Sequence, residues 1–254
     1  MQKYKKKKNK LVKLIILLGI ILFVFIFIII TYKVSTTEKF IYINKSKNLG
    51  AEIIIIDTKS DNYVKYTIPR ETEFDSARGY GTYKLSSLWT LSEADTIKGK
   101  LVAETVSKNL FLPIYLWKDE SESNLTIIQK LKSIIIEKKI ANDEVDLNIK
   151  NISNSVYINF IDKSLENNDI KITVNDLTGS VDTIQTLSKL IEVSGSKITS
   201  NSKGYDENLD CKIEGSDTSV VVYFSKILDC EKNIVSTSNN ELIITLGAKF
   251  TSRF

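Results

Sequence analysis

The sequence of 254 residues contains no histidine, two prolines, two cysteines and three arginines. Without histidine, catalytic triads built on an imidazole and the common zinc sites are excluded. The GxSxG nucleophile elbow, the P-loop and the GxGxxG dinucleotide motif are also absent. A serine–lysine dyad stays open, because both residue types occur throughout the chain, but no spacing singles out a pair.

Acidic residues are missing from the first 33 residues, which hold eight lysines. Residues 14–30 then lack any charged or hydrogen-bonding side chain and would span about 26 Å as a helix. A cleaved secretory signal is the alternative, but no Ala-x-Ala pattern follows the apolar run. We therefore predict a cytoplasmic basic tail at residues 1–10 and an uncleaved transmembrane helix at residues 11–32. The basic tail should stay inside, which makes the rest of the chain extracytoplasmic.

The charge of the remaining chain argues against a nucleic-acid partner. Of the 35 basic residues, eight lie in residues 1–33, so the remainder carries 35 − 8 = 27 basic and 31 acidic residues, a net charge of 27 − 31 = −4. The basic tail is instead suited to contact the anionic lipid of a bilayer.

Hydrophobic patterning predicts an α/β fold in two parts. In the first part, alternating or continuous apolar runs predict strands at residues 40–43, 51–56, 63–68 and 114–117, with a hairpin turn at residues 57–62. Helices are predicted at residues 96–110 and 125–135. The second helix should present a core-facing stripe of Leu125, Ile128, Leu131 and Ile135, with Ser121 or Ser123 as its cap.

A polar region rich in asparagine, aspartate and serine predicts a domain boundary near residue 165. Beyond it the pattern restarts with a strand, a helix ended by Gly195 and further strands, as expected for a small α/β domain. The expected strands are residues 170–174, 197–200 and 241–247, the expected helix is residues 181–193, and residues 219–228 could form either. The predicted domains are therefore residues 40–165 and 168–254.

The segment from Ile68 to Trp89 brings Arg70, Arg78 and Lys84 close together in a chain with three arginines. Arg70 follows a predicted strand, and Pro69 fixes the backbone before it. A rigidly held cation at a strand end suits an anionic ligand such as phosphate or pyrophosphate. The alternative is a strand–loop–helix connection with ordinary surface charges.

Several of these segments resemble the LytR-CpsA-Psr family of cell-envelope proteins. YTIPRETEF is similar to that family's strand-end SIPRD motif, RGYGTYKLSSLW to its following segment, and GKLVAETVSKNLFLPIYLW to its next helix and strand. IKITVNDLTGS and ELIITLGAKF resemble the first and last strands of the LytR C-terminal domain. The resemblance implies a shortened LytR-CpsA-Psr-like domain at residues 40–165 and a LytR C-terminal-like domain at residues 168–254.

The resemblance also implies a function. Members of this family bind a polyprenyl pyrophosphate and transfer its glycopolymer to peptidoglycan, so Arg70 would contact the pyrophosphate. Lys84 and Arg78 would add positive charge, and Mg²⁺ would be held by Glu71, which replaces the motif's aspartate, and by Glu52. Charge on the leaving group must be neutralised by such cations during transfer.

This chain departs from the family, because residues 119–168 contain no arginine where the family has an arginine-rich stretch. A pocket with so few cations favours a noncatalytic envelope protein that binds wall polymer or an envelope partner. The alternatives are an active glycopolymer phosphotransferase and a structural membrane anchor or assembly factor.

The two cysteines, Cys211 and Cys230, both belong to the predicted extracytoplasmic part. In an oxidising compartment they should form a disulfide, and closing a loop of about 20 residues should contribute roughly 3 kcal/mol. Two free buried thiols are the alternative.

Overall fold

The computed structural model describes residues 12–25, 39–48, 50–60, 62–139, 144–146, 154–166, 170–216, 218–235 and 240–254. The chain divides into two units, Met1–Thr36 and Thr37–Phe254. In the first unit, residues 12–25 form a helix whose side chains are all exposed. None of the helices in the described part of the chain is long and apolar enough to cross a membrane. The predicted basic tail and residues 11 and 26–32 of the predicted span lie outside the described residues.

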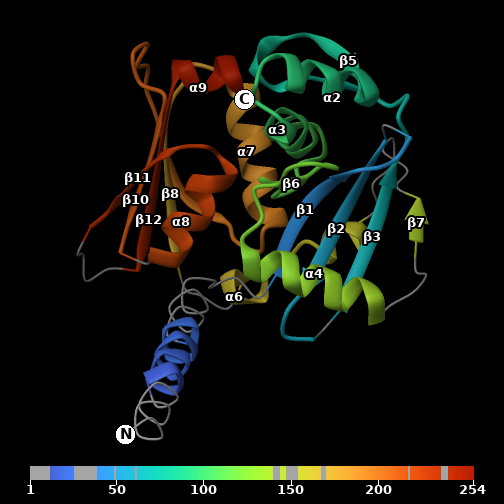
Figure 1. Ribbon diagram of the computed structural model, residues 1–254. Coiled ribbons are helices and arrows are strands. Elements are labelled where there is room, and N and C mark those ends of the chain that lie inside the picture. The colour runs from blue at the N-terminus through green and yellow to red at the C-terminus, as the bar shows by residue number, and fades with distance from the viewer. Residues whose placement is uncertain are drawn as a thin grey trace, which may run out of the picture. The chain divides into compact units, whose positions relative to one another are not determined.

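The unit Thr37–Phe254 is a mixed α/β structure, as the patterning predicted, and its strands form two five-stranded sheets and a two-stranded one (Figure 1). The first sheet has the order β6 (Leu116–Lys118), β1 (Lys39–Lys45), β2 (Ala51–Asp57), β3 (Asn62–Ile68) and β7 (Glu144–Asp146). The second has the order β11 (Glu231–Ile234), β10 (Cys211–Gly215), β12 (Glu241–Gly247), β8 (Lys171–Leu177) and β9 (Ile198–Lys203). The boundary predicted near residue 165 lies, along the chain, after the last strand of the first sheet and before the first strand of the second. Residues 167–169 lie outside the described residues.

The first sheet is buried on both faces, which explains the nearly continuous apolar run of β2. Alternate residues of β1 and β2 point to opposite sides. Ile41, Ile43 and Ile53 pack against α2 (Leu85–Ala94) and α3 (Gly99–Leu110), whereas Phe40 and Ile54 pack on the other face with α4 (Ile127–Lys139). The turn of the β2–β3 hairpin falls where predicted, and the Asp57 carboxylate accepts hydrogen bonds from the Lys59 and Ser60 amides.

The second sheet has its own core. The helices α7 (Val181–Val193), α8 (Thr218–Ile227) and α9 (Ala248–Arg253) pack their apolar side chains against it. Of residues 219–228, left open between helix and strand, residues 219–227 belong to the helix α8, and Leu228 follows it. The short helices α5 (Asn154–Ile158) and α6 (Lys163–Glu166) lie in the chain between the two sheets.

Two predicted helices are corrected by the structure. The helix predicted to begin at Thr96 begins at Gly99, because Thr96 and Lys98 adopt positive φ values of 59° and the Asp95 amide still donates to Leu91 at the end of α2. The caps proposed for the next helix, Ser121 and Ser123, are wrong. Thr126 caps α4 instead, in a reciprocal pair in which its amide donates to the Gln129 side chain and its hydroxyl accepts from the Gln129 amide.

Candidate functional site

The structure brings together two of the three cations predicted to form an anion site. Arg70 follows Pro69 at the end of β3, and Lys84 ends β5 (Thr82–Lys84), which pairs with β4 (Glu73–Asp75). Arg70 Nε donates to Glu71 Oε1 at 3.1 Å, and Lys84 Nζ donates to Glu71 Oε2 at 2.7 Å. Arg70 and Lys84 are therefore neighbours, held on opposite oxygens of one carboxylate.

The charges in this trio partly cancel. The hydrogen bond and charge of Lys84, followed by those of Arg70, lower the pKa of the Glu71 carboxyl, and the same contact raises the pKa of Lys84. All three groups are ionised at neutral pH and sum to one positive charge. Their side chains are about half exposed, so water and salt screen the interactions strongly.

Arg70 also lines an open hollow of about 500 Å³ along α2, shared with Ser86, Ser87, Thr90, Leu91 and Ala94. Serine and threonine hydroxyls can hydrogen-bond a polar or anionic group. The first two amides of α2 are already used, because Leu85 donates to the Thr72 carbonyl and Ser86 to the Arg70 carbonyl. This hollow can therefore hold a polar group beside Arg70, with an anion competing against Glu71 for the cations.

Arg78, the third predicted cation, makes a different set of contacts. It lies in η1 (Ala77–Gly79), where its φ is +65°, a left-handed conformation that is unfavourable for a residue with a Cβ. Its guanidinium makes two hydrogen bonds with the Glu104 carboxylate, at 2.7 and 2.8 Å, and lies 3.7 Å from Asp229. The Glu104 hydrogen bonds raise the pKa of Arg78 above its ordinary value. The expectation that Arg78 joins Arg70 and Lys84 in one pocket is therefore not met by its contacts.

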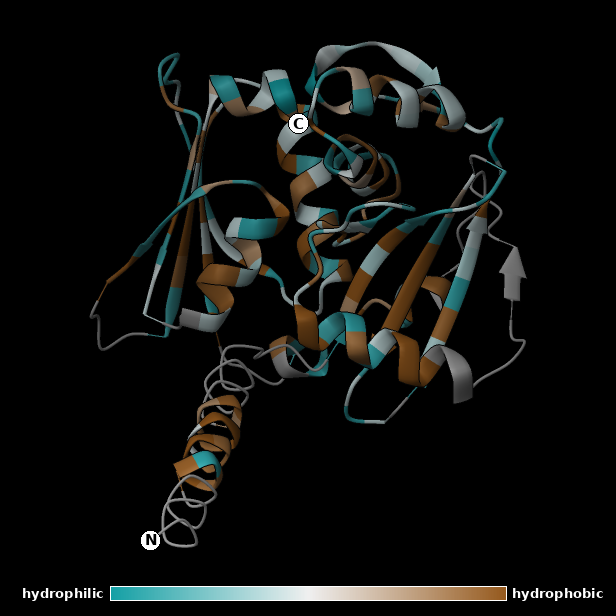
Figure 2. Cartoon of the chain, viewed as in Figure 1, coloured by the Kyte–Doolittle hydropathy of each residue, from teal (hydrophilic) through white to brown (hydrophobic). Residues whose placement is uncertain are grey.

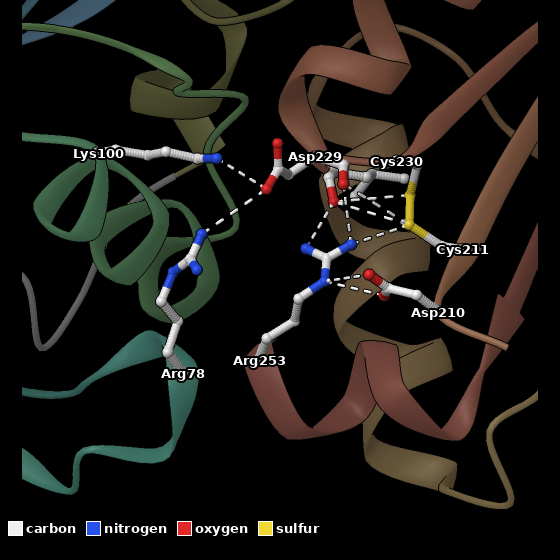
Figure 3. The surroundings of a disulfide bond; sticks show 8 residues. Arg78, Lys100, Asp210, Cys211, Asp229, Cys230 and Arg253 are labelled. Carbon is white, nitrogen blue, oxygen red and sulfur yellow. Dashed lines mark hydrogen bonds and ion pairs between the residues drawn. A yellow bond between two sulfur atoms is a disulfide. The ribbon is translucent and has the colours of Figure 1, made fainter. Parts of the chain in front are cut away.

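The unit Thr37–Phe254 has a first half, which contains the first sheet, and a second half, which contains the second sheet. Arg78 belongs to a charged network that joins these two halves. Lys100, on α3, lies 2.7 Å from Asp229, which follows α8 in the second half (Figure 3). Burial alone would raise the pKa of Asp229, but the Lys100 hydrogen bond and the charges of Lys100, Arg253 and Arg78 outweigh it and lower the pKa. Complementary charges from distant parts of the chain thus meet at one carboxylate.

The predicted disulfide between Cys211 and Cys230 is confirmed, with a Cα–Cα distance of 5.1 Å. It lies beside this network, because Cys230 directly follows Asp229 in the chain. Arg253, on the last helix, donates to both oxygens of Asp210, to the Leu228 and Asp229 carbonyls and to the Cys211 sulfur (Figure 3). Disulfide and arginine together fix the turn that presents Asp229.

A groove of about 570 Å³ opens next to the network. It is lined from the first half by α3, residues 114–116 and Asn124, and from the second half by the end of α8 and the start of β11. Its charged lining residues are Lys100, Glu104, Lys226, Asp229, Glu231 and Lys232. Three lysines and three carboxylates balance there, so the groove suits a polar partner of mixed charge better than a polyanion.

The two carboxylates predicted to hold Mg²⁺ do not share contacts. Glu52 accepts a hydrogen bond from Asn44 and lies 3.7 Å from Lys65, whereas Glu71 contacts Arg70 and Lys84. In the parts of the chain that the structure describes, no group of three or more histidine, cysteine, aspartate or glutamate side chains could hold a metal ion. The contacts of Glu52 and Glu71 therefore give no support to a magnesium site shared by these two carboxylates.

Neither a protein-family model, nor a curated protein, nor a solved structure matches the chain. The resemblance to the LytR-CpsA-Psr family therefore stays a prediction that rests on the motifs in the sequence. Sequence reasoning missed the roles of Glu104, Asp229 and Arg253. The scarcity of arginine was a usable signal, since all three arginines pair with carboxylates.

Proposed function

We propose that the protein is a membrane-anchored, extracytoplasmic envelope protein, related to the LytR-CpsA-Psr family, that binds a wall polymer or an envelope partner without performing transfer chemistry. The helical residues 12–25 support the anchor, because their large apolar side chains are all exposed and the apolar sequence continues to Ile30. The lysines before this run favour a cytoplasmic N-terminus. The disulfide supports an oxidising location for the rest of the chain.

The distribution of the arginine contacts is the observation that carries the noncatalytic assignment. A pyrophosphate brings several negative charges, which Arg, Lys or a metal must neutralise as the leaving group departs. Arg70 and Lys84 already share Glu71, and Arg78 is committed to Glu104 and Asp229. One net positive charge at a half-exposed surface is too little for this transfer chemistry. The proposal therefore places the binding of wall polymer or partner on the C-terminal-like domain, away from Arg70 and Lys84.

Binding to wall material can be measured directly on the full chain. The full chain, purified in detergent, is incubated with cell-wall sacculi that carry their native glycopolymer, and the bound fraction is compared for wild type and Arg70→Ala. We expect binding to persist in the variant. A chain that does not sediment with sacculi, or with envelope protein complexes used in parallel, would contradict the proposal.

The anchor has a separate test. Intact cells that make the chain are treated with protease from the outside, and membranes from a parallel culture are washed with carbonate. The chain should stay in the washed membranes. The residues after Lys33 should be digested by the external protease or, if they resist it, should react with a label that cannot cross the membrane. Release by carbonate, or labelling of the body from the cytoplasmic side alone, would contradict the anchor and its orientation.

A glycopolymer phosphotransferase is the second candidate. The convergence of Arg70 and Lys84 beside the polar hollow along α2 favours it. This function predicts transfer from a polyprenyl pyrophosphate donor that requires Mg²⁺ and is lost in both Arg70→Ala and Lys84→Ala. If the full chain neither binds the lipid donor nor transfers its glycopolymer, this candidate is excluded.

A further inference from the structure

The helix α4 carries a stripe of exposed apolar side chains. A core-facing role was predicted for Leu131 and Ile135, and the structure corrects it, because both point to solvent. Figure 2 shows hydrophobic residues along this helix at the surface of the unit. The exposed members of the stripe, with their exposed fractions, are Ile127 (69%), Leu131 (56%), Ile134 (48%) and Ile135 (56%). Their spacing of four, three and one residues places them along one side of a helix.

This stripe is additional to the face that packs α4 into the protein. The inner face supplies Ile136, which is buried with Phe40 and Ile56 in the core on the outer side of the first sheet. Ser133 is also buried on that side, where its hydroxyl donates to the Lys130 carbonyl. The face of α4 that packs into the protein is therefore a different one from the outward stripe. Singly exposed apolar residues need no explanation, but a contiguous stripe marks an interaction surface.

The charges on α4 indicate which surface it would meet. The sequence of α4 contains four lysines, at positions 130, 132, 138 and 139, and one acidic residue, Glu137. Helices that lie in a membrane interface combine an apolar face with lysines or arginines beside it, because the apolar face enters the acyl boundary while the cations meet anionic headgroups.

The position of α4 agrees with a membrane surface. The core under α4 contains Phe40, the second residue of β1, so the helix packs at the end of the sheet where the chain enters from the N-terminus. Six residues, 33–38, separate the predicted span from β1. A chain of this length reaches about 20 Å at most. If residues 11–32 cross the bilayer, covalent geometry keeps the entry end of β1 near the outer membrane surface.

We propose that the α4 stripe rests in the headgroup–acyl boundary of the same membrane that holds the anchor, and that it orients the body on that surface. This inference rests on the proposed anchor. The bilayer is preferred over a second copy of the chain or a soluble protein because the lysine bias and the chain entry point both favour it.

Depth-dependent quenching tests this contact. The full chain is reconstituted into vesicles of phosphatidylcholine and phosphatidylglycerol whose acyl chains are brominated, and the tryptophan emission of Leu131→Trp is compared with that of Tyr205→Trp. Tyr205 is equally suited to carry an exposed probe, at 67% exposure, and follows β9 in the second half. Wild type supplies the baseline, since Trp89 and Trp117 are buried. We expect Leu131→Trp to lose more emission than Tyr205→Trp and to shift to the blue on reconstitution.

Each outcome decides between the proposals. Flotation with the vesicles and equal quenching of the two probes would overturn the α4 contact while leaving the anchor intact. Failure of the chain to float with vesicles would overturn the anchor and this inference together. Self-association of the reconstituted chain that buries Leu131→Trp without lipid quenching would assign the stripe to a second copy and overturn the bilayer contact. Replacement of Lys130 and Lys132 by glutamine should reduce the extra quenching in vesicles with phosphatidylglycerol, and no change there would contradict the role of the lysines.

Discussion

Replacing Arg78 with alanine should lower the free energy of unfolding by about 2 kcal/mol. Breaking a buried ion pair costs roughly 3–5 kcal/mol, whereas an exposed pair contributes about 0–1 kcal/mol. The Arg78 and Glu104 side chains are 26% and 15% exposed, which places the pair between these limits. Lys100 lies 3.8 Å from Glu104, so the carboxylate keeps a cation after the substitution. We therefore expect a loss nearer to the middle of the range.

Arg78→Gly separates the ion pair from the backbone strain. Both variants lose the guanidinium, but glycine adopts φ = +65° without the penalty of about 1–2 kcal/mol that a Cβ imposes in the left-handed region. Glycine also makes the unfolded chain more flexible, which lowers stability and offsets roughly 0.4–1 kcal/mol of that gain. The glycine variant should accordingly be more stable than the alanine variant by about 0.5–1 kcal/mol.

Urea unfolding of the full chain in detergent, followed by tryptophan fluorescence and circular dichroism, measures both differences. The buried Trp89 and Trp117 report on the core of the first half. Arg70→Ala is the matched control, because its ion pair with Glu71 is half exposed and its loss should change stability by less than about 0.5 kcal/mol. The reasoning is refuted if Arg78→Ala matches the control, or if the glycine variant is the less stable of the two.

Two further predictions concern the turn beside the network. The Cys211–Cys230 disulfide joins residues 19 positions apart, and its reduction should lower the free energy of unfolding by about 3 kcal/mol and the Tm by roughly 6–12 °C. Circular dichroism with and without reductant measures the Tm. An unchanged Tm would show that the bond contributes nothing. Asp229→Asn should be less stable than wild type at pH 7 by up to about 1 kcal/mol, since Asp229 is nearly half exposed. The folded-state pKa of Asp229 is lowered, so its contribution is present above its unfolded value near 3.9 and is lost as the pH falls through the folded value. The difference between variant and wild type should therefore shrink below about pH 4, and a difference that grows in acid would contradict this assignment.

Hydrophobic patterning predicted the bounds of those helices and strands whose apolar residues recur with the period of the element and all face one core. The helix α7 and the strand β12 have the predicted bounds, because Leu187, Leu190 and Ile191 face one core and β12 alternates with the sheet. The helix α2 was missed, since Leu85, Leu88 and Trp89 are too few to establish a period in ten residues. Of the stripe predicted for the helix α4, Leu125 is buried, whereas Leu131 and Ile135 are exposed. The helix has two apolar faces, and periodicity does not say which one is buried.

The candidate site shows a similar limit. The pairing of Arg70 with Lys84 could be predicted, because both flank a short hairpin and lie near each other along the chain. The partner of Arg78 could not, since Glu104 and Asp229 come from distant elements and no local pattern marks them. The disulfide could be predicted from the predicted extracytoplasmic location together with the cysteine count, because two cysteines allow a single pairing.

The central claim is that this body binds at the envelope without transfer chemistry, and one comparison tests it most directly. Wild type and the double variant Arg70→Ala/Lys84→Ala are assayed in parallel for binding to sacculi and for Mg²⁺-dependent transfer from a polyprenyl pyrophosphate donor. The account predicts equal binding by both proteins and no transfer product from either. Transfer by wild type that disappears in the double variant would contradict it.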